Sequence, residues 1–244
     1  MKIKFFGTGH GVPAKERYCQ CILVEVNGAN YVFDVGAPIA DLLHREETPF
    51  NTVKGIFVTH LHADHITGIF HFLDLASWYY RDVEVEVYLP EKRGVETLKM
   101  VMDMYSGNDE PCERIRTYCY DEKLCYRDEN ICVSAIATKH MGENNLSYGF
   151  IVKAEGKQIL ISGDLKYSLE DYPTVLDKEN FDFVIFECAH FEPAELLERA
   201  RNAKTEKMAL VHVFPLSKYD TFKNYSDTVP FEMIYPEDGE AIKL

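Results

Sequence analysis

Residues 55–65 read GIFVTHLHADH, and this stretch decides what kind of protein the chain forms. Its first four residues are an apolar run that predicts a short buried strand. Four potential metal ligands follow it: His60, His62, Asp64 and His65. His60 and His62 can point the same way, because alternate residues of an extended segment share a face. Imidazole nitrogens and carboxylate oxygens are donors that Zn²⁺, Mn²⁺ and Fe²⁺ accept, so the stretch predicts a metal site.

Strand and helix patterns continue on both sides of this stretch. Asn27-Gly28 between two β-favouring runs is typical of a tight hairpin. Strands are expected at 2–6, 20–26, 30–34, 55–58, 84–88, 131–138, 147–153, 158–161, 182–186, 208–213 and 231–235, and helices at 37–46, 66–80, 91–105 and 193–204. Two halves of strands followed by helices indicate an α/β fold with sheets packed face to face and helices outside. Because no Gly-, Pro- or Ser-rich linker interrupts the chain, we expect one domain spanning residues 1–244.

Composition narrows the choice of partners. The 244 residues include 26 Lys and Arg against 40 Asp and Glu, a formal charge of −14. This charge repels a phosphate backbone, so nucleic acid is a disfavoured partner. Apolar runs are far shorter than the ~20 residues of a membrane helix, and the N-terminus MKIKFFGTGHGVP lacks the apolar stretch of a signal peptide. We therefore expect a cytoplasmic protein without a membrane partner.

The seven cysteines form no CxxC pair. They fit reduced, buried thiols better than a disulfide framework, which is typical of small secreted chains. A zinc site built from Cys112, Cys119, Cys125 and Cys132 is disfavoured, because their spacings match neither a finger nor a ribbon.

The HxHxDH pattern after a strand resembles the metallo-β-lactamase superfamily, and later segments match that family's motifs in order. His140 in ATKHMGENNLSYGF resembles its third motif, Asp164 in ILISGDLKYS its bridging aspartate, and His212 in MALVHVFP its final histidine ligand. The resemblance covers nearly the whole chain. It implies a four-layer αβ/βα sandwich, the metallo-β-lactamase fold, with two mixed β-sheets flanked by helices.

The resemblance also implies two divalent metal ions, with Zn²⁺ expected first and Mn²⁺ or Fe²⁺ as alternatives. One ion would be held by His60, His62 and His140, the other by Asp64, His65 and His212, and Asp164 would bridge them. A hydroxide between the ions would attack a carbonyl carbon or a phosphorus, since metal binding lowers the pKa of water from 15.7 to ~7. Asp64 would orient this hydroxide and help to move its proton, which makes it a catalytic candidate.

Within the superfamily, the chain is most similar to the ribonuclease Z-like branch. FFGTGHGVPAKERY resembles that branch's opening segment, SYGF resembles the segment after its third motif, and FDFVIFECAHF resembles its strand that ends in His-Glu-Ala-Thr, with Glu187 at the Glu position. The branch's downstream Gly-His-Ser-Thr stretch, which carries its general acid, is missing here, as is its tRNA-gripping arm. We expect His190 to serve as general acid instead, oriented by Glu187. A helix-capping or pocket-rim role for His190 is the alternative.

These features predict a dinuclear metal-dependent hydrolase. The leading interpretation is a phosphodiesterase for a small phosphodiester, either a cyclic phosphate or a nucleotide. An acyl hydrolase of the same fold, opening a lactone or a thioester, stays open because the same ions serve both reactions. The acidic charge and the missing arm disfavour a tRNA 3′ processing endonuclease, and the complete ligand set disfavours a metal-binding protein without turnover. The expected partner is a small-molecule substrate, and a homodimer is left open.

Some positions stay undecided. His44 and His71, inside expected helices, are interpreted as structural, whereas His10 lies in a Gly-rich loop that could approach the site. Lys166 is equally compatible with binding a phosphate and with an exposed loop position. The segment 90–130 matches no motif and is expected to carry substrate-specific structure.

Overall fold

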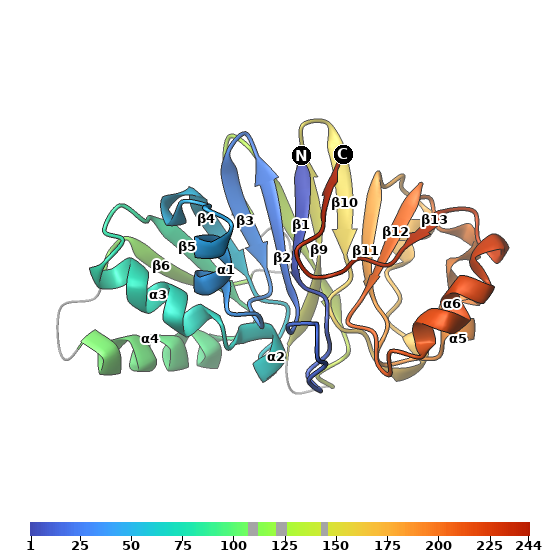
Figure 1. Cartoon of the computed structure of the whole chain (residues 1–244), viewed down its shortest axis with the longest axis horizontal. Coiled ribbons are helices and arrows are strands. Elements are labelled where there is room, and N and C mark those ends of the chain that lie inside the picture. Colours follow the sequence, from blue (N-terminus) through green and yellow to red (C-terminus); the bar gives the residue numbers. More distant parts are fainter. Residues whose placement is uncertain (107–111, 121–125, 143–145) are drawn as a thin grey trace.

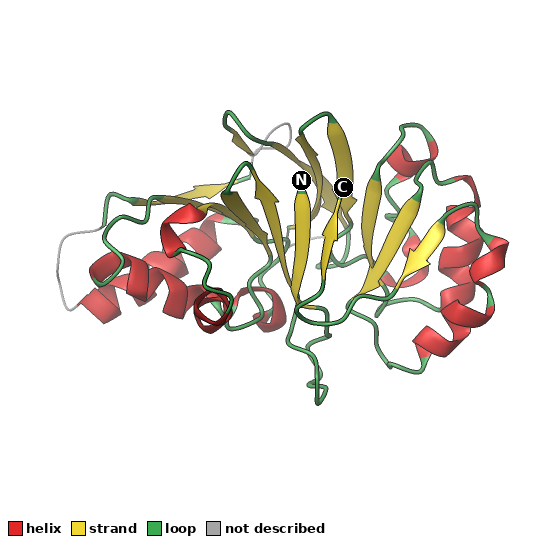
Figure 2. Ribbon diagram, turned by 45° about the horizontal axis from the view of Figure 1, so that its top comes forward, coloured by secondary structure: helices red, strands yellow, loops and turns green. Residues whose placement is uncertain are grey.

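The computed structural model describes residues 1–106, 112–120, 126–142 and 146–244. Its strands form two sheets of seven strands each, which face each other in the centre of the molecule (Figure 1). Helices cover the two outer faces (Figure 2). The chain therefore has the four-layer αβ/βα sandwich that the sequence predicts.

The first sheet comes mainly from the N-terminal half and has the order β14-β1-β2-β3-β4-β5-β6. Its strands are β1 (Lys2–Gly7), β2 (Cys21–Val26), β3 (Ala29–Phe33), β4 (Val53–Phe57), β5 (Val85–Leu89), β6 (Ile115–Cys119) and β14 (Ala241–Lys243). Pairing is antiparallel from β14 to β3 and parallel from β3 to β6. Helices of this half are α1 (Ile39–Arg45), α2 (Ala63–Ile66), α3 (Ile69–Trp78) and α4 (Lys92–Ser106).

The second sheet has the order β13-β12-β11-β10-β9-β8-β7. Its strands are β7 (Tyr126–Arg127), β8 (Cys132–Thr138), β9 (Ser147–Ala154), β10 (Lys157–Ile161), β11 (Phe183–Glu187), β12 (Lys207–Val211) and β13 (Glu232–Ile234). Pairing is again antiparallel from β7 to β10 and then parallel to β13. Two helices, α5 (Pro193–Arg199) and α6 (Lys218–Asn224), pack on its outer face. Short 3₁₀ segments lie at Phe50–Thr52, Tyr167–Leu169, Thr174–Asp177, Ala200–Asn202 and Ser226–Thr228.

Three apolar clusters hold the layers together. The central cluster lies between the sheets and contains fully buried aromatic rings from both, including Phe5, Tyr31 and Phe150. The second joins the first sheet to α1, α3 and α4, and the third joins the second sheet to α5 and α6. The central strands are thus buried on both faces, which explains why parallel strands such as β11 and β12 read as nearly continuous apolar runs.

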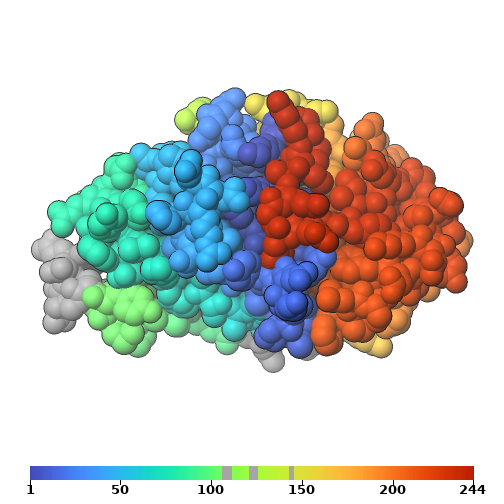
Figure 3. Space-filling model, viewed as in Figure 1, coloured from blue at the N-terminus to red at the C-terminus, as the bar shows by residue number. Residues whose placement is uncertain are grey.

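Local sequence explains several boundaries. Asn27 and Gly28 both have positive φ, 51° and 80°, as the predicted tight hairpin between β2 and β3 requires. Pro193 begins α5, where Glu192 and Glu195 form a reciprocal capping box. In Figure 3 the C-terminal residues lie across the middle of the visible face, where β14 pairs with β1.

The structure corrects the sequence prediction at other elements. The helix expected over 66–80 is two helices, α2 and α3, separated at Gly68. The Gly68 backbone N donates to Val35 O, and a Cβ at this position would lie 1.9 Å from Ala37 O. This close backbone contact breaks the helix. The expected list also missed β6, β7, β14 and α6. Within the segment 90–130, expected to carry substrate-specific structure, residues 107–111 and 121–125, Cys125 included, lie outside the described residues.

Candidate metal centre

The candidate metal centre lies where strands of both sheets end. His60 follows β4, His140 follows β8, Asp164 follows β10 and His212 follows β12. β8, β10 and β12 run in the same direction, so their C-terminal ends lie at one edge of the second sheet. β4 of the first sheet ends at the same place, and four distant segments of sequence meet there. Figure 1 places α2, which contributes two more candidate ligands, at the end of the sandwich away from the chain termini.

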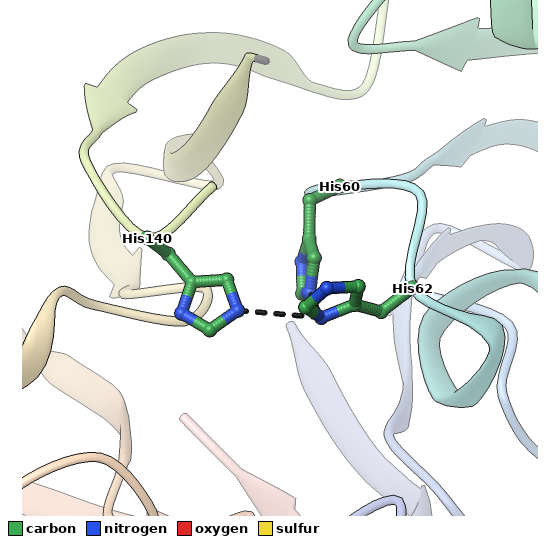
Figure 4. A group of neighbouring side chains, drawn as sticks. All are labelled: His60, His62 and His140. Carbon is green, nitrogen blue, oxygen red and sulfur yellow. Dashed lines mark hydrogen bonds between the residues drawn. The ribbon is translucent and has the colours of Figure 1, made fainter. Parts of the chain in front are cut away.

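The three histidines of the predicted first metal position lie together (Figure 4). His60 Nε2 is 2.9 Å from His62 Nδ1, which is 3.3 Å from His140 Nε2. His60 is buried, His140 is half-buried and His62 is exposed. The group is therefore anchored in the core on one side and open to solvent on the other.

The three ligands of the predicted second position also converge. His212 Nε2 lies 3.2 Å from both His65 Nε2 and Asp64 Oδ2. The ring of His65 is fully buried, and Asp64 lies on its solvent side as a half-buried carboxylate. His212 has φ 52°, a backbone conformation that residues other than glycine rarely adopt. Such strain is tolerated where the surrounding structure fixes the residue, as at functional sites.

Asp164 lies between the two groups. Its Oδ2 is 3.8 Å from His60 Nε2, 3.7 Å from His140 Nε2 and 3.5 Å from His65 Nε2. Its Oδ1 is 3.7 Å from His212 Nδ1. One buried carboxylate therefore faces both triads, which is the position that a bridging ligand occupies.

The donor set fits two divalent metal ions. Burial lowers the pKa of His60 and of His140, which favours the neutral imidazole, the form that binds metal. Burial raises the pKa of Asp164, but the imidazoles of His212 and His65 outweigh it and hold that pKa well below its usual range. His212 Nδ1 is buried and has no hydrogen-bond partner, although buried polar atoms are normally paired. A cation between these donors would satisfy nitrogens that otherwise face one another.

Sequence reasoning missed two residues behind the site, Asp34 and Thr59. Asp34 Oδ2 lies 2.7 Å from His65 Nδ1, and Asp34 Oδ1 accepts the backbone N–H of Thr59 at 2.7 Å. A proton on His65 Nδ1 leaves Nε2 free to bind a metal. Burial lowers the pKa of His65, but Asp164 and Asp34 raise it well above its usual value. This pocket of carboxylates thus favours positive charge.

A glycine sets the position of Asp64. A Cβ at Gly36 would lie 1.7 Å from the backbone oxygen of Asp64, so no other residue fits without movement of α2. Gly36 belongs to the FDVG segment after β3, and Asp34 lies two residues before it. In the sequence, Asp34 and Gly36 are visible only as an acidic residue and a glycine at the end of a strand. The tertiary structure is needed to show what they contact.

Glu187 and His190 lie together at the edge of the metal centre. Glu187 Oε1 is 2.9 Å from His190 Nδ1 and also accepts the backbone N–H of Leu165, at 2.9 Å. The opposite ring nitrogen, Nε2, lies 3.8 Å from Asp164 Oδ2. Burial lowers the pKa of His190, but the hydrogen bond and charge of Glu187 outweigh it, and the pKa is raised. The predicted pair therefore has the geometry for holding and donating a proton.

The structure shows which of the residues left undecided by the sequence lie near the candidate metal centre. His10 approaches the site: its ring centroid lies 4.8 Å from that of His212 and 4.7 Å from that of Phe214, with which it is stacked. His44 and His71 are exposed on α1 and α3, away from the core. Lys166 Nζ donates to Glu170 at 2.9 Å on the surface. Among the described residues, no group that could hold a metal contains a cysteine, and the six described cysteines are unpaired thiols.

The sandwich and its paired histidine–aspartate clusters define the class. The chain is a metal-dependent hydrolase of the metallo-β-lactamase superfamily, related to ribonuclease Z. Within that class it belongs to the family of the anti-Pycsar protein Apyc1, whose family model matches residues 1–223. Within the described ranges, no helix has both the length and the apolar character needed to span a membrane.

Similar proteins agree with this assignment. Ribonuclease Z of Methanocaldococcus jannaschii is 32% identical over 178 residues, which are 68% of this chain and 55% of that protein. The chain thus spans about half the length of the curated relatives it matches. The fold is shared with YhfI of Bacillus subtilis (TM-score 0.78, 15% identity, 99% of each chain). It is also shared with the short form of human tRNase Z, ELAC1 (TM-score 0.76, 22% identity, 100% of this chain and 99% of that one).

Proposed function

We propose that the chain is a phosphodiesterase that hydrolyses a cyclic nucleotide at a centre of two divalent ions, Zn²⁺ first among the candidates. Membership of the Apyc1 family supports a cyclic nucleotide as the substrate class. The proposed ligands are His60, His62 and His140 for one ion, Asp64, His65 and His212 for the other, and Asp164 as the bridge. The strong negative charge of the chain favours a small substrate over a nucleic acid.

The observation that carries this proposal is the His190–Glu187 pair beside the predicted bridging ligand. When bound, the two ions would supply Lewis acidity and a water of lowered pKa. Asp64 is suited to orient this water by accepting a hydrogen bond from it. Burial raises the pKa of Asp64, but the hydrogen bond to His212 and the charges of His65 and His212 outweigh it, hold the pKa well below its usual range and favour the ionised carboxylate. As the water oxygen bonds to phosphorus, the bond from phosphorus to the ribose oxygen breaks. His190 then gives its Nε2 proton to that oxygen, which would otherwise leave as a high-energy alkoxide.

An aromatic surface beside the centre supports recognition of a nucleobase. The Phe214 side chain is 39% exposed and stacks on His10, whose ring in turn contacts His212. A nucleobase stacked on Phe214 would lie one aromatic ring farther out than His10, with its phosphate toward His212. Stacking is tolerant of base identity, because every base has a π-face. We therefore propose a surface that accepts both pyrimidine and purine cyclic nucleotides.

The test uses the full chain with two ions per molecule, verified by elemental analysis. We expect it to open a 3′,5′-cyclic nucleotide to the nucleoside monophosphate and to hydrolyse bis(p-nitrophenyl) phosphate. Asp64→Ala should abolish both reactions. His190→Ala should slow opening of the cyclic nucleotide by ~10²–10⁴-fold, the usual contribution of a general acid.

p-Nitrophenolate leaves without a proton, so His190→Ala should largely spare the activated diester. Loaded protein that opens lactones or thioesters but neither phosphodiester would replace the proposal with the acyl hydrolase. Protein that cannot retain two ions would contradict both.

A further inference from the structure

Lys218 is a buried lysine that the proposed reaction does not use. It is the first residue of α6, and its side chain is only 10% exposed. Burying an ammonium is costly, and a cation at the start of a helix is electrostatically unfavourable. A lysine that breaks both local rules has to be stabilised by specific contacts in the fold.

The side-chain hydrogen bonds of Lys218 all go to one short segment, residues 188–191, and its ion pair, with Glu192 Oε1 at 3.9 Å, lies directly after that segment. Lys218 Nζ donates to Ala189 O at 3.0 Å, to Phe191 O at 2.5 Å and to Cys188 O at 3.5 Å. The segment belongs to neither β11 nor α5, so strand and helix hydrogen bonds do not fix it. The Lys218 ammonium thus supplies hydrogen bonds that no strand or helix provides here, and it holds the carbonyl groups on both sides of His190.

Glu187 and Lys218 thus hold different groups of this segment: Glu187 contacts the His190 ring and a backbone N–H, and Lys218 contacts only backbone carbonyls. Glu187 Oε1 holds the ring through Nδ1, and Glu187 Oε2 accepts the backbone N–H of Ala189 at 2.7 Å. Lys218, on α6, donates to the carbonyl oxygens of Ala189 and Phe191, which flank His190. Without the Lys218 ammonium, the His190 ring would keep its hydrogen bond to Glu187. The His190 Cα could nevertheless shift, because residues 188–191 would have lost their second anchor.

We infer that Lys218 is a positioning residue: it fixes the peptide groups on both sides of His190 and so holds the imidazole at the metal centre. This inference rests on the proposed function, in which His190 protonates the leaving oxygen. A displacement of about 1 Å in a group that must meet a reacting atom costs on the order of 100-fold in rate. Lys218 thereby acts on the reaction through the backbone of residues 188–191.

The experiment compares Lys218→Met with Lys223→Met in two-ion holoenzyme. Methionine keeps most of the side-chain length and removes the ammonium, and Lys223 is an exposed lysine on the same helix, near Tyr235. We expect Lys218→Met to slow opening of a cyclic nucleotide by about 10–100-fold and to leave hydrolysis of bis(p-nitrophenyl) phosphate nearly unchanged. Lys223→Met should change neither rate. Because both rates are measured on one sample, their ratio is independent of the fraction of folded protein.

Two further measurements separate positioning from general loosening. Adding Lys218→Met to His190→Ala should cause no further loss on the cyclic nucleotide, because the group being positioned is already absent. Amide hydrogen exchange in residues 188–192 should become faster in Lys218→Met and stay unchanged in Lys223→Met.

Equal loss on both substrates, or no loss on either, would overturn the inference. If His190→Ala is selective for the cyclic nucleotide and Lys218→Met is not, only the positioning role is wrong. If His190→Ala itself is not selective, the acid role in the proposed function is wrong, and the role of Lys218 falls with it.

Discussion

Replacing Asp34 with asparagine should release one metal ion and leave the other bound. The Asp34 carboxylate accepts two buried N–H groups, one on each oxygen: Thr59 N at 2.7 Å and His65 Nδ1 at 2.7 Å. An asparagine has one oxygen and one NH₂ group, so one of these donors would face another donor. If the His65 proton moves to Nε2 instead, the nitrogen that faces Asp64 and His212 can no longer bind a metal.

The size of the effect follows from these two bonds. Losing the group that orients a metal-bound histidine weakens metal binding by ~10–100-fold, which is about 1.4–2.7 kcal/mol. Leaving one buried donor unpaired also lowers the free energy of unfolding by about 1–3 kcal/mol. The metal effect should fall on the position built from Asp64, His65 and His212, since His65 is the ligand that Asp34 holds.

The assay is dialysis against graded chelator concentrations, followed by elemental analysis. Wild-type protein should lose its two ions at higher chelator concentrations than Asp34→Asn, which should lose one ion early and retain the other. Asp128→Asn is the matched control: the same substitution at a carboxylate bonded to Tyr31 and Tyr126, in the turn between β7 and β8. It should retain both ions. Folded Asp34→Asn that keeps both ions with wild-type affinity, or loses both together, would refute the reasoning.

Two other substitutions test the proposed stacking surface at Phe214 and the carboxylate of Asp128, which is not part of the candidate metal centre. Phe214→Ala should raise KM for a cyclic nucleotide by ~5–100-fold with little change in kcat, because a stacked base contributes about 1–3 kcal/mol; an unchanged KM in steady-state kinetics would count against the surface. Burial raises the pKa of Asp128, but hydrogen bonds from the Tyr31 and Tyr126 hydroxyls outweigh it and lower that pKa. The stabilisation is therefore complete above the unfolded value of ~3.9 and is lost as the pH falls through the lower folded value. Asp128→Asn should cost about 1–2 kcal/mol in urea unfolding at pH 7 and less at pH 3, whereas a difference independent of pH would contradict this.

The candidate ligands could be picked out from the sequence because each one lies at or near the end of a recognisable strand. Apolar runs of four to eight residues are readable in one dimension, and His60, His140, Asp164 and His212 come at or just after their ends. The spacing of these strands along the chain then reproduces the order of motifs in a known superfamily. Neither signal depends on which side chains touch, so both were available without a structure.

Contacts between distant segments were not readable in this way. Asp34 contacts His65 across 31 positions, and Lys218 contacts Ala189 across 29. The helix expected over 66–80 was interrupted by a backbone approach at Gly68 that the apolar pattern does not register. α6 and β14 were missed because α6 is short and rich in polar residues and β14 has only three residues. Their formation depends on tertiary packing more than on local propensity.

The two halves of the molecule contribute to the site through matching positions. Each sheet changes from antiparallel to parallel pairing at one strand, β3 in the first and β10 in the second. Asp34 and Asp164 follow those strands. On the next strand of each sheet, a histidine comes three residues after the last strand residue: His60 after β4 and His190 after β11.

Neither half holds a complete set of donors. The candidate first position combines His60 and His62 with His140, and the second combines Asp64 and His65 with His212. Since each position takes ligands from both sheets, neither can form before the sheets have packed. We therefore expect bound ions to stabilise the packed arrangement of the two sheets, and removal of both ions to lower the free energy of unfolding of the chain.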